Sequence, residues 1–200
     1  MSFVIKIKNN KVTKTPLLRG VRGCVIKSGK GLLMVFTGKG KGKTTAALGM
    51  AFRALGHGFK VCVIQFIKGN WKYGELVSSK RFDDLLDFHV MGKGFTWESE
   101  NLEEDTKIAQ QAWNFAKDAI NSGKYQMVIL DELTYLIKYK MISEDEIVSF
   151  LSNHPDGLHI VVTGRDASDS LIEAADLVTD MVSIKHPYDS GIKAQKGIEY

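Results

Sequence analysis

Residues 32–47 constrain the fold of this chain more than any other stretch. An apolar run from Leu32 to Phe36 leads into a loop of glycine and lysine, and the loop opens into an alanine-rich segment with helical spacing. This strand–loop–helix order is the setting of a phosphate-binding loop. The glycines let backbone N–H groups converge on an anion, and the helix N-terminus carries partial positive charge. A flexible basic turn, the alternative interpretation, is disfavoured by the strand before it and the helix after it.

The loop departs from the common pattern G-x-x-x-x-G-K-[ST] in its spacing. Thr37 stands five residues before Gly42, and the first glycine, Gly38, comes one position later, so we expect a loop that is one residue tighter. Lys43 is predicted to reach the terminal phosphates, and Thr44 to offer its hydroxyl to a magnesium ion. The predicted phosphate-binding residues of this loop are Gly38, Lys39, Gly40, Lys41, Gly42, Lys43, Thr44 and Thr45.

A second signal lies at residues 127–132, where four apolar residues deliver Asp131 and Glu132 to the end of a predicted strand. In nucleotide-binding folds, carboxylates in this position hold the magnesium ion or its water shell. We therefore predict a metal site made by Thr44, Glu132 and Asp131. The alternative is that the two acids only cap the helix that follows, because acids are common at helix N-termini.

Apolar patterning indicates that strands and helices alternate along the chain. Gln65 lies near the end of one such strand and is expected near the nucleotide edge. The expected strands cover residues 61–67, 86–91, 159–165 and 177–184, besides those before the loop and before Asp131. The expected helices cover residues 43–55, 101–122 (starting at Asn101), 143–152 (capped by Ser143, with Glu146 at the capping-box position) and 168–175, with a loop at 68–80. This alternation predicts a single α/β domain of the P-loop NTPase-like (RecA-like) type. Its sheet is mostly parallel, with helices on both faces and sites at the carboxyl edge.

Charge is distributed unevenly along the 200 residues. Residues 1–74 contain 15 Lys or Arg and no acid, so they carry +15 against −11 for the remainder, within a net charge of +4. We expect residues 1–30 to be a basic, partly mobile segment with a weak strand at 1–8, and residues 31–200 to be the P-loop domain. A basic arm would suit nucleic acid, but its few aromatics and missing recognition helix favour a role over a polyanionic nucleotide.

The chain has two cysteines, no apolar run of membrane-spanning length and no signal-peptide core. Cys62 lies in an apolar run and is expected to be a buried small hydrophobe, so neither a disulfide framework nor a zinc site is supported. We expect a cytoplasmic protein that does not contact the membrane.

A glycine-flanked loop at residues 91–97 carries two large aromatics, Phe95 and Trp97. In an extended loop these alternate residues point the same way and form one flat apolar surface. Such a pair either plugs the core or contacts a large, flat, mostly apolar ligand, and both interpretations stay open from the residues alone.

Taken together, these motifs resemble the bacterial ATP:corrinoid adenosyltransferases of the P-loop type. The resemblance covers about residues 32–200, whereas residues 1–30 carry no matching motif. Lys39 stands where better-known members have Asn. The matching segments are residues 36–47, 53–54, 56–58, 65–69, 94–97, 130–135, 163–165, 185–191, 193–195 and 197–198.

The resemblance implies transfer of the 5′-deoxyadenosyl group from ATP to the Co(I) of a reduced corrinoid, with release of triphosphate. It implies that Arg53 and Arg165 join the ATP-binding residues and that Phe95 and Trp97 face the corrinoid and help to displace its lower axial ligand. It further implies a reversed orientation of the nucleotide, Mg²⁺ with Mn²⁺ as a substitute, no covalent catalytic nucleophile, a homodimer, and a reductant protein such as a flavodoxin.

Two other functions use the same motifs. A P-loop phosphotransferase or NTPase would attack the γ-phosphate of ATP and would need a hydroxyl acceptor or a positioned water. A nucleic-acid-binding ATPase would use the basic N-terminal segment on phosphates, although we regard nucleic acid as a disfavoured partner. A zinc-bearing nucleoside kinase is disfavoured by the two cysteines.

Overall fold

The fold is that of a computed structural model, which describes residues 29–67, 69, 73–92, 94 and 102–199. It contains one sheet of six strands in the order β3-β2-β4-β5-β1-β6, and every pair of neighbours is parallel. The strands are β1 (Leu33–Thr37), β2 (Val61–Gln65), β3 (Leu86–Val90), β4 (Met127–Asp131), β5 (His159–Thr163) and β6 (Leu177–Asp180). The predicted α/β domain with a parallel sheet is confirmed.

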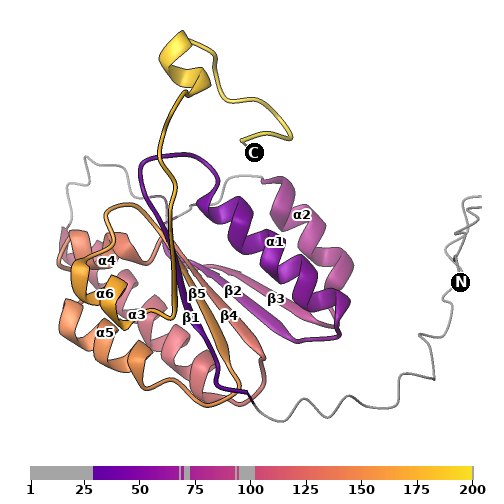
Figure 1. The fold of residues 1–200 in the computed structure, drawn as a ribbon, viewed down its shortest axis with the longest axis vertical. Helices are drawn as coiled ribbons and strands as arrows, with labels where there is room; N and C mark the ends of the chain where they lie inside the picture. The colour runs from indigo at the N-terminus through magenta and orange to yellow at the C-terminus, as the bar shows by residue number, and fades with distance from the viewer. Residues whose placement is uncertain (1–28, 68, 70–72, 93, 95–101, 200) are drawn as a thin grey trace, which may run out of the picture.

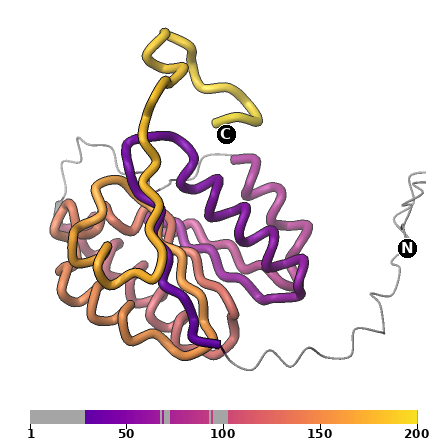
Figure 2. Tube along the Cα trace, in the orientation of Figure 1, coloured from indigo at the N-terminus to yellow at the C-terminus, as the bar shows by residue number. Residues whose placement is uncertain are grey.

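Helices cover both faces of this sheet (Figure 1). Helices α1 (Lys43–Gly56) and α2 (Gly74–Ser79) lie on one face, followed by the 3-10 turn η1 (Lys80–Phe82). The other face is covered by α3 (Leu102–Asn121), α4 (Thr134–Lys138), α5 (Glu144–Ser152) and α6 (Asp169–Ala174). The chain ends in a tail beyond β6, which contains the 3-10 turn η2 (Pro187–Ser190) and turns back toward the sheet edge (Figures 1 and 2).

Alternate residues of the central strands point to opposite faces of the sheet and pack into two separate hydrophobic cores. Leu33, Val35 and Ile64 pack with α3 to α6, whereas Met34, Phe36 and Val63 pack with α1. Because both faces are covered, the central strands are apolar at successive positions instead of alternating with polar residues. This double burial produced the continuous apolar runs from which the strands were predicted.

Two predictions differ from the structure by more than two residues, and both concern segments where the chain leaves the sheet. The loop expected at residues 68–80 contains helix α2, followed by η1 from Lys80. The last strand ends at Asp180 and not at 184. Met181 N–H still donates to Thr37 O of β1 at 2.9 Å, but Met181 O accepts from Gly40 N–H of the glycine–lysine loop at 2.6 Å. The apolar residues beyond, such as Ile184, are therefore exposed.

Helix α5 begins as predicted, but its capping box is not closed by Glu146. Ser143 Oγ accepts a hydrogen bond from Glu146 N–H at 3.2 Å. The Glu146 carboxylate accepts instead from Trp113 Nε1 at 2.8 Å and Lys117 Nζ at 3.0 Å, both on α3. These two bonds hold the pKa of Glu146 below its usual range, and they dock α5 on α3 around the fully buried Trp113.

The expectation for Cys62 is confirmed. Its side chain is fully buried in β2, and burial, with the charge of Asp87 as a smaller cause, raises the pKa of the thiol to about 12. Cys24, the expected strand at 1–8 and the N-cap Asn101 lie outside the described residues. In the part of the chain that the structure describes, no helix has the length and apolar character to cross a membrane.

Candidate functional site

The glycine–lysine loop joins β1 to α1 at the carboxyl edge of the sheet. Gly42 precedes the helix with φ 120°, a conformation that residues with a Cβ rarely adopt, and its carbonyl accepts from Ala46 N–H at 2.7 Å. Lys43, the first residue of the helix, folds back over the loop. Its Nζ donates to Gly38 O and to Gly40 O, each at 2.8 Å. The lysine ammonium therefore lies inside the loop.

The environment of Lys43 favours anion binding. Burial lowers the pKa of its ammonium, Arg165 lowers it further, and the carboxylates of Glu132 and Asp131 act in the opposite direction. A lysine and an arginine held close together in a partly desolvated site gain from a negatively charged ligand, which relieves their mutual repulsion. The loop thus has the electrostatics of a polyphosphate site.

Close contact with the segment after β6 explains two of the glycines in this loop. A Cβ on Gly40 would lie 2.6 Å from Met181 O, and a Cβ on Gly38 would lie 2.6 Å from the same oxygen. Both distances are too short for a side chain. The close backbone contact between the loop and residues 180–182 therefore requires glycine at both positions.

Asp131 ends β4, and its carboxylate is held by three side chains from three other elements. Oδ1 accepts from Thr44 Oγ1 at 2.8 Å and from Thr163 Oγ1 at 2.7 Å, and Oδ2 accepts from Gln65 Nε2 at 2.9 Å. The carboxylate is buried, so these bonds compensate for its loss of hydration. Because Thr44 gives its proton to Asp131, the lone pairs of its hydroxyl are left for a metal ion.

Glu132 has a backbone conformation that is uncommon for a side-chain-bearing residue. Its φ is 65°, in the left-handed region, and its N–H donates to Thr163 Oγ1 at 2.9 Å. This turn directs the chain away from β4, and Glu132 lines the cavity beside the loop. Strained backbone of this kind is concentrated at functional sites, and here it brings a carboxylate to the lysine-rich loop.

A hydrogen bond between the segments that follow β4 and β5 holds the backbone of Arg165. Thr134 Oγ1 donates to Arg165 O at 2.7 Å, and Gly164, with φ 146°, leaves room for the Thr134 side chain. Arg165 also lines the cavity. The predicted Arg165 and Glu132 are therefore brought to the loop by neighbouring strands that end at the same edge.

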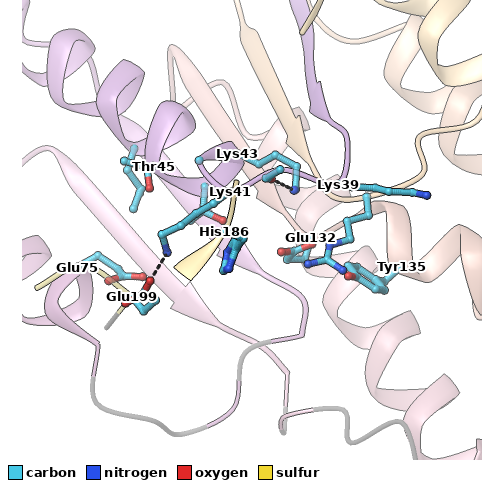
Figure 3. A pocket seen from close by; sticks show the side chains of 14 residues that line it. Lys39, Lys41, Lys43, Thr45, Glu75, Glu132, Tyr135, His186 and Glu199 are labelled. Carbon is cyan, nitrogen blue, oxygen red and sulfur yellow. Dashed lines mark hydrogen bonds and ion pairs between the residues drawn. The ribbon is translucent and has the colours of Figure 1, made fainter. Parts of the chain in front are cut away.

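These groups surround a cavity of about 460 Å³. It is lined by Lys39, Gly40, Lys41, Gly42, Lys43, Thr44, Thr45, Leu48, Glu75, Glu132, Tyr135, Arg165, His186 and Glu199. Figure 3 shows Lys39, Glu132 and Tyr135 toward one end, and Lys41, Glu75 and Glu199 toward the other. Both ends contain cations, but only the second carries the acids of α2 and the tail.

The tail contributes groups that the sequence analysis did not assign to the site. Glu199 pairs with Lys41 at 3.4 Å (Figure 3), and its other oxygen accepts from Gln195 N–H at 2.8 Å. His186 Nδ1 accepts from Tyr188 N–H at 3.2 Å, so the neutral ring carries its proton on Nε2 and is a donor there. Tyr135, in the first turn of α4, also lines the cavity and was also missed.

One predicted site residue, Arg53, does not join this group. Arg53 is exposed in the last turn of α1, about 15 Å along the helix axis from Lys43. Phe95 and Trp97 lie outside the described residues, but Gly94 does not: its N–H donates to Ile67 O at 3.1 Å. The segment that leads to the aromatic pair therefore starts beside β2, at the same edge of the sheet as the loop.

The arrangement fits a magnesium ion bound together with phosphates. The available donors are hard oxygens, the Thr44 hydroxyl and the Glu132 carboxylate, and magnesium is usually held by one or two such groups plus phosphate oxygens and water. Asp131, with three donors already on its carboxylate, would act through Thr44. A parallel sheet with this loop and these carboxylates defines a P-loop nucleotide-binding protein.

Comparison with known proteins gives the family. Residues 29–200 match the family described as ATP:corrinoid adenosyltransferase BtuR/CobO/CobP, and the chain belongs to this family. A corrinoid adenosyltransferase of Sinorhizobium sp is 48% identical over 173 residues, which are 86% of this chain and 81% of that protein. The corrinoid adenosyltransferase of Pseudomonas aeruginosa is 44% identical, covering 86% of this chain and 84% of the other. Corrinoid adenosyltransferase CobA of Salmonella typhimurium is 43% identical, with 86% of each chain covered.

Lys43→Ala is expected to lower turnover at saturating ATP by about 100-fold or more, because the variant loses the buried cation that faces the phosphates. Alanine is compatible with the first turn of α1, so the variant should remain folded by circular dichroism. Lys60→Ala, an exposed lysine at the start of β2, is the matched control and should retain its activity. Full turnover of Lys43→Ala would remove the loop from the mechanism.

Proposed function

We propose that this enzyme transfers the 5′-deoxyadenosyl group of ATP to the cobalt of a reduced corrinoid, cobalamin or a precursor, and releases triphosphate, in the synthesis or salvage of adenosylcobalamin. The observation that carries the proposal is the loop with its inward lysine, Lys43, beside Glu132 and Arg165, in a chain of this family. ATP would occupy the cavity, with its phosphates against the loop.

The reaction we propose needs no protein nucleophile. Co(I) supplies the electron pair that attacks C5′ of the ribose, the C5′–O bond breaks, and its electron pair leaves with the triphosphate. The cobalt becomes Co(III) in the new cobalt–carbon bond. The protein has to align cobalt with C5′ and stabilise the charge that develops on the leaving group.

The cations around the cavity suit that second task. Lys43 is already desolvated, and Lys39 and Arg165 line the same cavity. Charges fixed in a partly water-excluded site stabilise a developing anion more than they would in bulk water. These three groups would therefore hold the triphosphate as the C5′–O bond breaks.

Magnesium, for which manganese would substitute, belongs to this proposal. Thr44 and Glu132 would hold the ion, and Asp131 would orient the Thr44 hydroxyl through the 2.8 Å hydrogen bond. When bound, the ion would neutralise part of the triphosphate charge. The remaining groups of the site would bind and orient the nucleotide.

Phe95 and Trp97 are proposed to contact the corrinoid. The support is chemical and positional: a flat apolar ligand suits an aromatic pair, and Gly94 starts this segment at the same edge as the loop. A reductant protein such as a flavodoxin and a homodimeric assembly stay predictions of the same proposal, as does a cytoplasmic location.

The fate of the phosphates tests the proposed reaction. With ATP, magnesium and chemically reduced cobalamin, we expect intact triphosphate in step with the absorbance change of a new cobalt–carbon bond, because attack at C5′ releases all three phosphates together. Ion-exchange chromatography of the products separates triphosphate from ADP. ADP as the main product would instead identify a phosphotransferase or NTPase.

Phe95→Ala and Trp97→Ala should leave ATP affinity within about twofold, because the pair lies outside the phosphate loop. Transfer should fall most when the corrinoid is supplied as Co(II), whose lower axial ligand must leave before reduction. The defect should be smaller with pre-formed Co(I), and stopped-flow spectra of both reactions make the comparison. Equal losses from the two starting states would contradict a role in displacing the axial ligand.

Glu132→Gln should raise the magnesium concentration needed for half-maximal turnover by about tenfold and lower the maximal rate, because an amide is a poorer ligand for a hard cation than a carboxylate. The measurement is a magnesium titration of the initial rate at saturating ATP. Glu173→Gln, an exposed residue in α6, is the matched control. If the magnesium titration of the variant matches that of the unsubstituted enzyme, Glu132 does not bind the metal and only caps the helix that follows.

A further inference from the structure

Gln65 is a fully buried polar residue at the end of β2, and nothing in the mechanism above uses it. Its side chain has no exposed surface. Its backbone lies between β4, where it pairs with Asp131, and β3, where it pairs with Val90. Its carbonyl accepts from Met91 N–H at 2.9 Å, the residue before Gly92. The residue therefore stands between the Asp131 carboxylate and the start of the segment that carries Phe95 and Trp97.

The charge of Asp131 fixes the orientation of the Gln65 amide. Nε2 donates to Asp131 Oδ2 at 2.9 Å. The flipped amide would place its carbonyl oxygen against a carboxylate oxygen, and two acceptors repel each other. The amide is therefore oriented with Nε2 toward Asp131 and with its carbonyl oxygen, Oε1, pointing away from Asp131.

Oε1 has no hydrogen-bond partner among the described residues, although it is buried. A buried acceptor without a donor is unfavourable, and in folded proteins nearly all such groups are satisfied by protein or water. The observed side-chain contact of Gln65 is thus the one with the Asp131 carboxylate.

The hydrogen bonds form a continuous path from Gln65 to the metal-binding hydroxyl. Gln65 Nε2 donates to Asp131 Oδ2, and Asp131 Oδ1 accepts from Thr44 Oγ1 at an oxygen–oxygen distance of 2.8 Å. Thr163 shares Oδ1 but not Oδ2. Among the described residues, Gln65 is therefore the side chain that fixes the rotation of the carboxylate at its second oxygen. Through the carboxylate it also sets the direction of the Thr44 lone pairs.

We propose that Gln65 is a positioning residue of the magnesium–triphosphate site. It orients Thr44 through Asp131, whose carboxylate it holds at Oδ2 while Oδ1 holds the Thr44 hydroxyl. The inference rests on the proposed function only in requiring that the enzyme bind magnesium with ATP. It does not depend on the fate of the phosphates or on the corrinoid.

Calorimetric titration of ATP, once with magnesium and once with EDTA, measures the effect without any turnover. Gln65→Met keeps the length of the side chain and removes both polar ends. We expect its ATP affinity in EDTA to stay within about twofold, whereas the gain in affinity from magnesium should fall about tenfold, as is typical when the partner of a metal ligand is lost. Loss of packing alone would lower both affinities alike.

Gln126→Met is the matched control, because Gln126 precedes β4 at the opposite edge of the same sheet, where its Oε1 accepts from Lys60 N–H at 2.8 Å. It should keep the full magnesium effect. If Gln65→Met does not fold, Gln65→Glu replaces it with the same shape and the same expected loss, because its carboxylate repels Asp131. A full magnesium effect in the folded Gln65 variant would overturn the proposal.

A double-mutant cycle with Asp131→Asn tests the path itself. If Gln65 acts through Asp131, Gln65→Met should change the magnesium effect less than about threefold in the Asp131→Asn background. An equal, tenfold loss in both backgrounds would contradict the coupling. These results are distinct from those of the phosphate assay, in which the proposed reaction fails through ADP formation while the magnesium effect persists.

Discussion

The buried carboxylate of Asp131 joins the elements that make up the site. Its oxygens accept from Thr44 of the loop, Thr163 of β5 and Gln65 of β2. A buried carboxylate is costly unless it is hydrogen-bonded, so each donor is needed to keep the charge in place. The same three bonds align the ends of neighbouring strands with the start of α1. Strand β5 lies beside β4, which is why Thr163 at the end of β5 can donate to Asp131 Oδ1 and accept from Glu132 N–H.

Electrostatic repulsion is the second constraint on this edge of the sheet. Three lysines lie within five residues of the loop, and the structure gives two of them separate partners. Lys43 donates to carbonyl oxygens of the loop itself, and Lys41 pairs with Glu199 of the tail. Both contacts use groups that a triphosphate would compete for. The loop is thus held in shape by interactions that a polyanionic ligand can replace.

The tail has a structural role in addition to lining the cavity. Gly40 N–H donates a hydrogen bond to Met181 O and so holds the tail against the loop. This contact is possible only where the loop has no side chain. Gly38 and Gly40 therefore serve the packing of the loop against residues 180–182, and Gly42 serves the turn into α1. A tight loop with its outer face covered in this way can present its remaining backbone N–H groups to one side only.

The sequence by itself determined the class of fold and the centre of the site. Double burial makes the central strands continuous apolar runs, and phosphate binding requires glycines and a lysine before a helix. Those local requirements are visible in residues 32–47 and 127–132. Lys43, Thr44 and Glu132 could be placed together in advance because parallel strands deliver their carboxyl ends to one edge, whereas Arg165 was predicted from the resemblance to the family.

Only the tertiary structure decided which side chains complete that site. The roles of Gln65 and Thr163 depend on strand order, because their bonds to Asp131 span 66 and 32 residues. Glu199 reaches Lys41 because the tail turns back over the loop, and no local pattern encodes that path. The last strand ends at Asp180 for a related reason: Met181 N–H still donates to Thr37 O of β1, but Met181 O accepts from Gly40 N–H of the loop. Apolar periodicity records burial along a strand, whereas contacts between distant segments depend on how the strands are ordered and where the chain crosses them.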